Sequence, residues 1–229
     1  MNKIGYSTGA IALGDFSRAV AILNAHDFQA IELSALRVHE VEPLIEAIPR
    51  LDLRKYAYIS FHAPSAFSEA EEEHLVCLLS QLPDNWPIVL HPDTVHRFER
   101  WHTLSNRLAI ENMDRRKKIG RSVQELIKVF ALLPGAKMCL DLGHARQVDS
   151  SMIEAYLLLM AFSDRIVQLH VSEVDTMNRH DVISFAAELA FSQLRRFIPR
   201  SIPVIVESRV NEQEIEHEAS KVKKTLSLS

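Results

Sequence analysis

The chain has 229 residues, of which 47% are hydrophobic and 24% charged, and its formal net charge is -4. This composition supports a substantial buried core and gives no overall attraction to nucleic acid or to an anionic membrane, although a local basic patch stays open. The two cysteines, Cys77 and Cys139, argue against a disulfide framework. The sequence lacks the apolar stretch of a signal peptide and any run of membrane-spanning length, so we expect a soluble cytoplasmic protein without a membrane partner.

Short apolar runs alternate along the chain with longer segments of helical periodicity. The runs that predict strands are Lys3–Ser7, Ala30–Ser34, Ala57–His62, Ile88–His91, Leu108–Glu111, Lys137–Asp141, Ile166–His170 and Val204–Glu207. The segments that predict helices are Asp15–Ala25, Val41–Ile48, Glu69–Leu82, Ser122–Leu133, Ser151–Phe162, Asp181–Phe197 and Glu212–Leu226, with Asp15 and Ser151 as N-caps. Strands alternating with helices form parallel sheets, and eight such units favour a closed barrel. We predict an α/β fold, a single (β/α)8 barrel that spans residues 1–229 as one domain.

Six consecutive predicted strands end in a carboxylate or an imidazole. These residues are His62, His91, Glu111, Asp141, His170 and Glu207. In a parallel barrel such ends lie on one rim, where the active sites of this fold are built. Crowded ionisable groups repel one another or lose their charge unless a cation neutralises them. A mixed set of His, Asp and Glu ligands suits zinc first, with manganese or iron as alternatives, so we predict a cluster of divalent ions.

Further polar residues follow the same strand ends. His144 comes three residues after Asp141, and His180 follows the seventh strand; both are candidate ligands of another ion, although an ordinary loop also explains His180. A basic run at residues 115–118 follows the fifth strand. The candidates for binding a phosphate or carboxylate of the substrate are Arg115, Arg146, Arg179 and Arg209.

These residues resemble the xylose-isomerase-like barrel superfamily, which contains endonuclease IV and many sugar isomerases and epimerases. The motifs are Ile-Glu111-Asn, Leu-Asp141-Leu-Gly-His144, Leu-His170 and Val-Glu207-Ser, and the resemblance covers nearly the whole chain. It implies that one metal ion is held by Glu111, Asp141, His170 and Glu207. In the isomerases of the superfamily, the residues that correspond to Glu111 and Glu207 also act as acid and base.

The chain resembles endonuclease IV beyond those four residues. That resemblance implies that His62 and His91 hold a first ion, that Glu111 bridges to a second, and that His144 and His180 are ligands of a third. Asn178 departs from the pattern, because that family has aspartate there and an amide is a neutral, weaker ligand. Barrels of this kind often dimerise, but no interface is readable in the sequence, so a homodimer stays open.

Two functions fit these residues. The first is a metal-dependent hydrolase of phosphoesters that uses two or three divalent ions, and the number of candidate ligands favours it. The alternative is a sugar or sugar-phosphate isomerase or epimerase that uses one ion, with Glu111 and Glu207 moving the proton. In both cases we expect a small sugar or phosphate-containing substrate. The acidic net charge and short loops do not favour duplex DNA, whose affinity depends on phosphate contacts.

Overall fold

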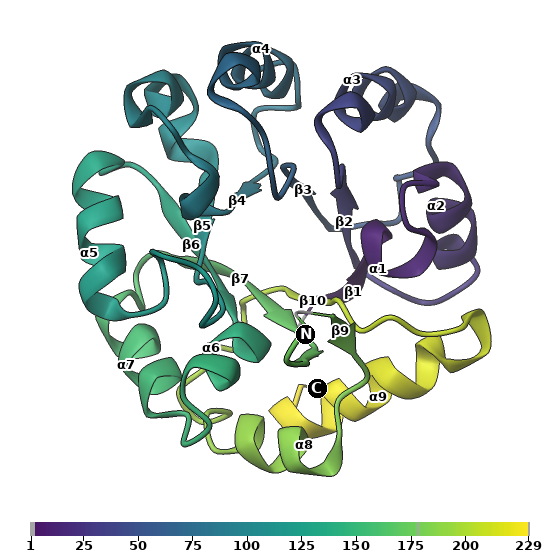
Figure 1. Ribbon diagram of the computed structural model, residues 1–229. Coiled ribbons are helices and arrows are strands. Elements are labelled where there is room, and N and C mark those ends of the chain that lie inside the picture. Colours follow the sequence, from purple (N-terminus) through teal and green to yellow (C-terminus); the bar gives the residue numbers. More distant parts are fainter. Residues whose placement is uncertain (1–2, 178, 229) are drawn as a thin grey trace.

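The computed structural model describes residues 3–177 and 179–228, and it confirms the predicted (β/α)8 barrel (Figure 1). Eight parallel strands close into a ring in the order β1-β10-β7-β6-β5-β4-β3-β2. Their bounds are β1 Ile4–Ser7, β2 Ala30–Ser34, β3 Tyr58–His62, β4 Ile88–Leu90, β5 Leu108–Glu111, β6 Lys137–Asp141, β7 Ile166–Val171 and β10 Val204–Val206. A separate two-stranded antiparallel sheet joins β8 (Glu173–Val174) to β9 (His180–Asp181).

The helices form an outer ring around the strands (Figure 1). Their bounds are α1 Thr8–Ala12, α2 Phe16–Asn24, α3 Val38–Ala47, α4 Glu69–Leu79, α5 Val123–Leu132, α6 Leu142–Val148, α7 Ile153–Ala161, α8 Phe185–Ser192 and α9 Ile215–Leu226. The described part of the chain also contains four 3-10 segments, at Ile48–Arg50, Pro92–Thr94, Phe98–Arg107 and Glu212–Glu214. Among the described residues, no helix combines the length and the apolar character that crossing a bilayer requires.

Three predicted helix starts need correction, and the first is that the helix predicted from Val41 begins at Val38. Asp15 caps α2 as predicted, since its side chain accepts a hydrogen bond from Arg18 N. Ser151 is not the N-cap of α7, because Met152 holds that position in a left-handed conformation with φ 63°. The helix predicted from Asp181 begins only at Phe185, because Asp181 pairs with Glu173 in the small sheet and Ser184 caps α8 instead.

The core lies between the strands and the helix ring, where the apolar faces of both layers are buried. A second, small buried cluster consists of Val89, Ala109 and Cys139 on three neighbouring strands. The strands β1 and β2 approach so closely that a Cβ on Gly5 would lie 1.6 Å from the carbonyl oxygen of Ala30. Because side chains alternate along a strand, the inward residues at the carboxyl ends of the strands meet at the same end of the barrel.

Candidate metal centre

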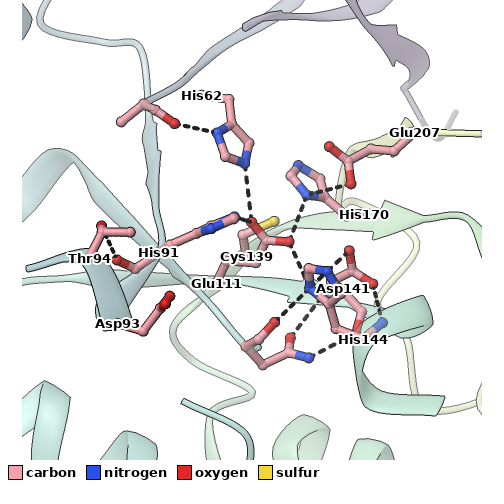
Figure 2. A network of polar contacts seen from close by, with 12 residues as sticks. His62, His91, Asp93, Thr94, Glu111, Cys139, Asp141, His144, His170 and Glu207 are labelled. Atoms are coloured by element: carbon pink, nitrogen blue, oxygen red, sulfur yellow. Dashed lines mark hydrogen bonds and ion pairs between the residues drawn. The ribbon is translucent and has the colours of Figure 1, made fainter. Parts of the chain in front are cut away.

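The carboxylate of Glu111 lies at the middle of the rim, surrounded by imidazoles (Figure 2). Its Oε2 atom is 3.0 Å from His91 Nε2 and 3.2 Å from His62 Nε2. Its Oε1 atom is 3.2 Å from His144 Nδ1 and 3.3 Å from His170 Nδ1. The side chain of Glu111 is only 1% exposed, so these contacts take the place of water. The two oxygens therefore face two different sets of side chains.

Among the residues that the structure describes, three sets of side chains each have ligand atoms within 4.8 Å of one another. One set is His62, His91 and Glu111, and a second is Glu111, Asp141, His170 and Glu207. These two sets share Glu111, and they contain all six of the strand-end residues identified in the sequence. The third set consists of Glu32, His62, His170 and Glu207.

His62 is held in an orientation that suits a ligand. Its Nδ1 donates a hydrogen bond to the backbone oxygen of Ala63 at 2.7 Å, so in the neutral ring the lone pair is on Nε2, which points at Glu111. On the neighbouring strand end, His91 presents its own Nε2 to the same carboxylate oxygen. The ring centroids of the two histidines are 5.0 Å apart, and this separation leaves their nitrogens free to converge on one ion.

Asp141 is fixed by its neighbours on both sides. Its Oδ1 caps α6 by accepting a hydrogen bond from His144 N at 2.7 Å. Its backbone N–H donates to Asn112 Oδ1 at 2.7 Å, and Asn112 Nδ2 donates to the backbone oxygen of Asp141 at 2.9 Å. The other carboxylate oxygen, Oδ2, is buried without a hydrogen-bond partner, and it lies 3.4 Å from His144 Nδ1 in an ion pair. Buried polar atoms normally have partners, so this oxygen is well placed for a cation.

His144 and His180 lie next to each other beside this cluster. The His144 Nδ1 atom faces the backbone oxygen of Asn112 at 3.0 Å, and its Nε2 is buried without a hydrogen-bond partner. The two rings are 5.4 Å apart, and His180 Nδ1 lies 2.8 Å from Ser172 Oγ. The predicted third-ion position also includes Asn178, which lies outside the described residues. The roles of His144 and His180 as ligands stay a prediction.

Charges in the metal-free cluster are strongly interdependent. Burial raises the pKa of Asp141 to about 6 and that of Glu207 to about 7, with a further contribution from the Glu111 charge. Burial alone would also raise the pKa of Glu111, but the charges of His170 and His91 hold it well below its usual range. The pKa of His144 rises to about 10 despite burial, because Asp141 and Glu111 favour its charged form. The cluster therefore holds protons that a bound cation would displace.

A pocket with about 920 Å³ of free space, part of it open to solvent, lies above these ligands. Its lining includes Arg209, one of the four arginines predicted to bind substrate, together with Arg116 and Lys117 from the basic run. The lining residues do not include the other three arginines. Arg146 forms an ion pair with Glu173, Arg179 forms one with Asp175, and the backbone N–H of Arg115 donates to Gln147.

Two buried residues next to the ligands were not identified in the sequence. Asn112 pairs with the backbone of Asp141, as described above, and Glu32 lies beneath the cluster with its Oε2 3.1 Å from His170 Nε2. Glu32 belongs to the predicted strand Ala30–Ser34, where it is the sole ionisable residue. An acidic residue in the middle of an apolar strand was the signal that would have identified it.

No family model matches the chain and no curated protein matches it, whereas several solved structures do. Endonuclease IV from Thermus thermophilus matches with a TM-score of 0.63 at 19% identity, over 98% of this chain and 99% of that chain. A putative sugar phosphate isomerase/epimerase from Anabaena variabilis matches with a TM-score of 0.66 at 13% identity, over 99% of each chain. A 3-keto-D-glucoside 4-epimerase from E. coli matches with a TM-score of 0.61 at 14% identity, over 99% of this chain and all of that one.

The chain has the barrel fold of these proteins. The resemblance inferred from its motifs is thereby confirmed for the fold. The residues of the rim also fit divalent ions on chemical grounds, since imidazole nitrogens and carboxylate oxygens converge there. Two of the buried atoms without hydrogen-bond partners, Asp141 Oδ2 and His144 Nε2, are of the kinds that metal ions accept as ligands.

Proposed function

We propose that this protein is a metal-dependent enzyme that hydrolyses a phosphoester, with two divalent ions sharing the carboxylate of Glu111. The supporting observation is the division of partners between its two oxygens. His62 and His91 lie at Oε2, whereas His170 lies at Oε1. A carboxylate placed between two ligand sets suits a bridging role, and the mixed ligands suit zinc first, with manganese or iron as alternatives.

The chain's own residues would have separate tasks in this reaction. Ions bound at the rim would supply a water molecule of lowered pKa and polarise the phosphoryl oxygens. Glu207 lines the pocket and belongs to the second ligand set, so it would help to hold the ion that faces the substrate. Arg209, at the edge of the same pocket, would attract and orient an anionic group. These features favour a small phosphate-containing substrate over duplex DNA.

A sugar or sugar-phosphate isomerase or epimerase is the second candidate. The observation that favours it is that Glu111 and Glu207 both approach the same nitrogen, His170 Nδ1, at 3.3 and 3.4 Å. In this reaction the second ligand set would hold a single ion. A substrate carbon near that ion would lie between the carboxylates of Glu111 and Glu207, which could remove and return its proton. In that case His62 and His91 would bind substrate hydroxyl groups instead of metal.

The count of bound ions distinguishes the two functions. We expect the purified protein to bind two zinc ions per chain and the double variant His62→Ala/His91→Ala to bind one fewer, because the first ligand set then retains only Glu111. The matched control is His74→Ala/His217→Ala, which removes two exposed histidines distant from the strand ends. Elemental analysis after dialysis in identical buffers measures the count, and turnover of bis-p-nitrophenyl phosphate measures hydrolysis.

A count of one ion that the double variant leaves unchanged would contradict the hydrolase and favour the isomerase. A wild-type protein that binds less than a tenth of an equivalent of any transition metal, and does not take it up on titration, would contradict both candidates. The control variant should match the wild-type protein in each measurement.

A further inference from the structure

A buried carboxylate lies directly beneath the metal centre, at Glu32 in the middle of β2. It is fully buried, with 0% of its side chain exposed. Three side chains approach its Oε2 atom: Gln168 Nε2 at 2.7 Å, Ser60 Oγ at 3.0 Å and His170 Nε2 at 3.1 Å. Of these three partners, His170 alone can carry a positive charge. Burying a carboxylate is costly unless its hydrogen bonds compensate, so the identity of these partners matters.

The two nitrogens of the His170 ring face opposite directions. Nδ1 points to the rim, 3.3 Å from Glu111 Oε1 and 3.4 Å from Glu207 Oε2 (Figure 2). Nε2 points to Glu32, in the barrel interior. A neutral imidazole carries its proton on one nitrogen and its lone pair on the other. Because a carboxylate only accepts hydrogen bonds, Glu32 favours the proton on Nε2 and leaves the lone pair on Nδ1, which faces the proposed ion.

Gln168 is the other group near His170 Nε2, at 2.6 Å. An N–H of this amide and an Nε2–H of the ring cannot both point along this short contact, so the proposed tautomer requires the two amide hydrogens to go to their other acceptors. These acceptors are Glu32 Oε2 at 2.7 Å and Cys139 Sγ at 3.7 Å. The amide oxygen of Gln168 accepts a hydrogen bond from Tyr58 OH at 2.8 Å, which fixes the amide in this orientation. Gln168 therefore holds the Glu32 carboxylate beneath the ring.

We propose that Glu32 is a positioning residue of the metal centre, which fixes the tautomer and orientation of His170 so that Nδ1 binds a divalent ion. This inference rests on the proposed function, since it requires that the rim binds metal. It explains why the barrel interior contains a carboxylate, an amide and a hydroxyl where apolar side chains would pack more easily. Groups that support a ligand in this way typically change metal affinity by about 10–100-fold when they are removed.

The inference has one structural competitor, in which Glu32 is itself a ligand. Glu32 belongs to a set with His62, His170 and Glu207 whose ligand atoms lie within 4.8 Å of one another. Its Oε1 atom is buried and has no hydrogen-bond partner. The two roles predict different numbers of bound ions. Removing a direct ligand from a small set abolishes the binding of one ion, whereas removing a positioning residue only lowers the affinity for that ion.

Glu32→Gln tests the inference, with Glu72→Gln as the matched control. Glu72 is also fully buried, but it accepts hydrogen bonds from His96 N and Trp101 Nε1, away from the rim. Cobalt(II) is titrated into each metal-free protein, and the visible absorption bands report both affinity and ligand geometry. We expect Glu32→Gln to bind the wild-type number of ions, one of them about 10–100-fold more weakly and with altered bands. Glu72→Gln should keep the wild-type affinity and spectrum.

Each outcome has a distinct meaning. Wild-type affinity and spectrum in Glu32→Gln would overturn the positioning role while the metal centre stands. Loss of a whole ion at saturating cobalt would overturn it in favour of a ligand role. A wild-type protein that binds no cobalt would remove the proposed function, and this inference with it.

A measurement on the wild-type protein covers the case in which Glu32→Gln does not fold. Nitrogen-15 NMR of the histidine-labelled, zinc-loaded protein reports the tautomer of each ring, and His170→Asn assigns the signal. We expect His170 to be protonated at Nε2 and zinc-bound at Nδ1. Zinc at Nε2 with the proton on Nδ1 would overturn the inference.

Discussion

Asn112 and Asp141 are joined by two hydrogen bonds that link the ends of β5 and β6. Asp141 N donates to Asn112 Oδ1 at 2.7 Å, and Asn112 Nδ2 donates to the Asp141 backbone oxygen at 2.9 Å. Both residues are 0% exposed. The side-chain amide of Asn112 thus pairs with the backbone of Asp141 as a neighbouring strand would. This pairing fixes the backbone from which the Asp141 carboxylate projects.

Asn112→Leu should destabilise the protein and weaken its metal binding. The substitution removes both hydrogen bonds and leaves the buried backbone N–H of Asp141 without its side-chain acceptor, at about 1–3 kcal/mol. We therefore expect the free energy of unfolding of the metal-free protein to fall by about 1–3 kcal/mol in urea denaturation. Asn106→Leu, at an exposed position, is the control and should change the unfolding midpoint little. Equal midpoints for Asn112→Leu and the control would show that the pairing does not stabilise the rim.

Glu111→Gln should abolish hydrolysis and leave the fold largely intact. The variant loses the charge that both ligand sets share, and its amide nitrogen cannot act as a ligand. We expect at least one ion to bind more than about 100-fold more weakly, since a direct ligand contributes more than the groups that support it. Metal titration, turnover and circular dichroism measure these effects, and Glu73→Gln, at an exposed position, serves as the charge-matched control. A variant with wild-type metal content and turnover would remove Glu111 from the centre.

The sequence predicted the fold and the six strand-end residues because both depend on a local pattern. Each strand is an apolar run, and a polar residue follows where the run leaves the core, as at Glu111 and Asp141. In a parallel barrel that pattern alone places the ends together. Glu32 was missed because it precedes two further strand residues instead of ending its strand.

Side-chain direction beyond the strands could not be predicted in the same way. Arg146 and Arg179 follow strands on the correct face, but their orientations depend on partners in loops. Arg146 reaches Glu173, which is 27 residues away, and Arg179 pairs with Asp175, four residues before it. A hairpin of two-residue strands has too few residues to produce a periodic signal, so the helix predicted from Asp181 was also wrong in its start.

Arg209→Gln should weaken the binding of a phosphate-like anion to the zinc-loaded protein. Arg209 lines the pocket, whereas Arg179 is paired with Asp175 and is absent from that lining. Because a guanidinium group contributes a charge-assisted hydrogen bond of about 1.5–3 kcal/mol, we expect inorganic phosphate or vanadate to bind about 10-fold more weakly or worse. Isothermal titration calorimetry measures the affinity. Arg179→Gln is the matched control, and an equal effect of the two substitutions would indicate general surface charge instead of a contact in the pocket.

The metal-free protein should lose stability as the pH rises from 7 to 9. Burial lowers the pKa of His62 and His144, but nearby carboxylates outweigh it and raise the pKa values to about 9 and about 10, against 6.5 for an ordinary histidine. A group whose pKa is raised by folding stabilises the protein fully below its unfolded pKa and loses that contribution as the pH rises to the folded value. The raised pKa values of Asp141 and Glu207 change stability in the same direction, but their contributions are lost by about pH 7.

The measurement is urea unfolding in the presence of a chelator, and we expect the free energy of unfolding to fall between pH 7 and 9. Zinc-loaded protein is the control: its stability should hold or rise with pH, because the ions bind the deprotonated ligands. A chelated protein whose stability stays level or rises between pH 7 and 9 would contradict the charge arrangement described for the rim.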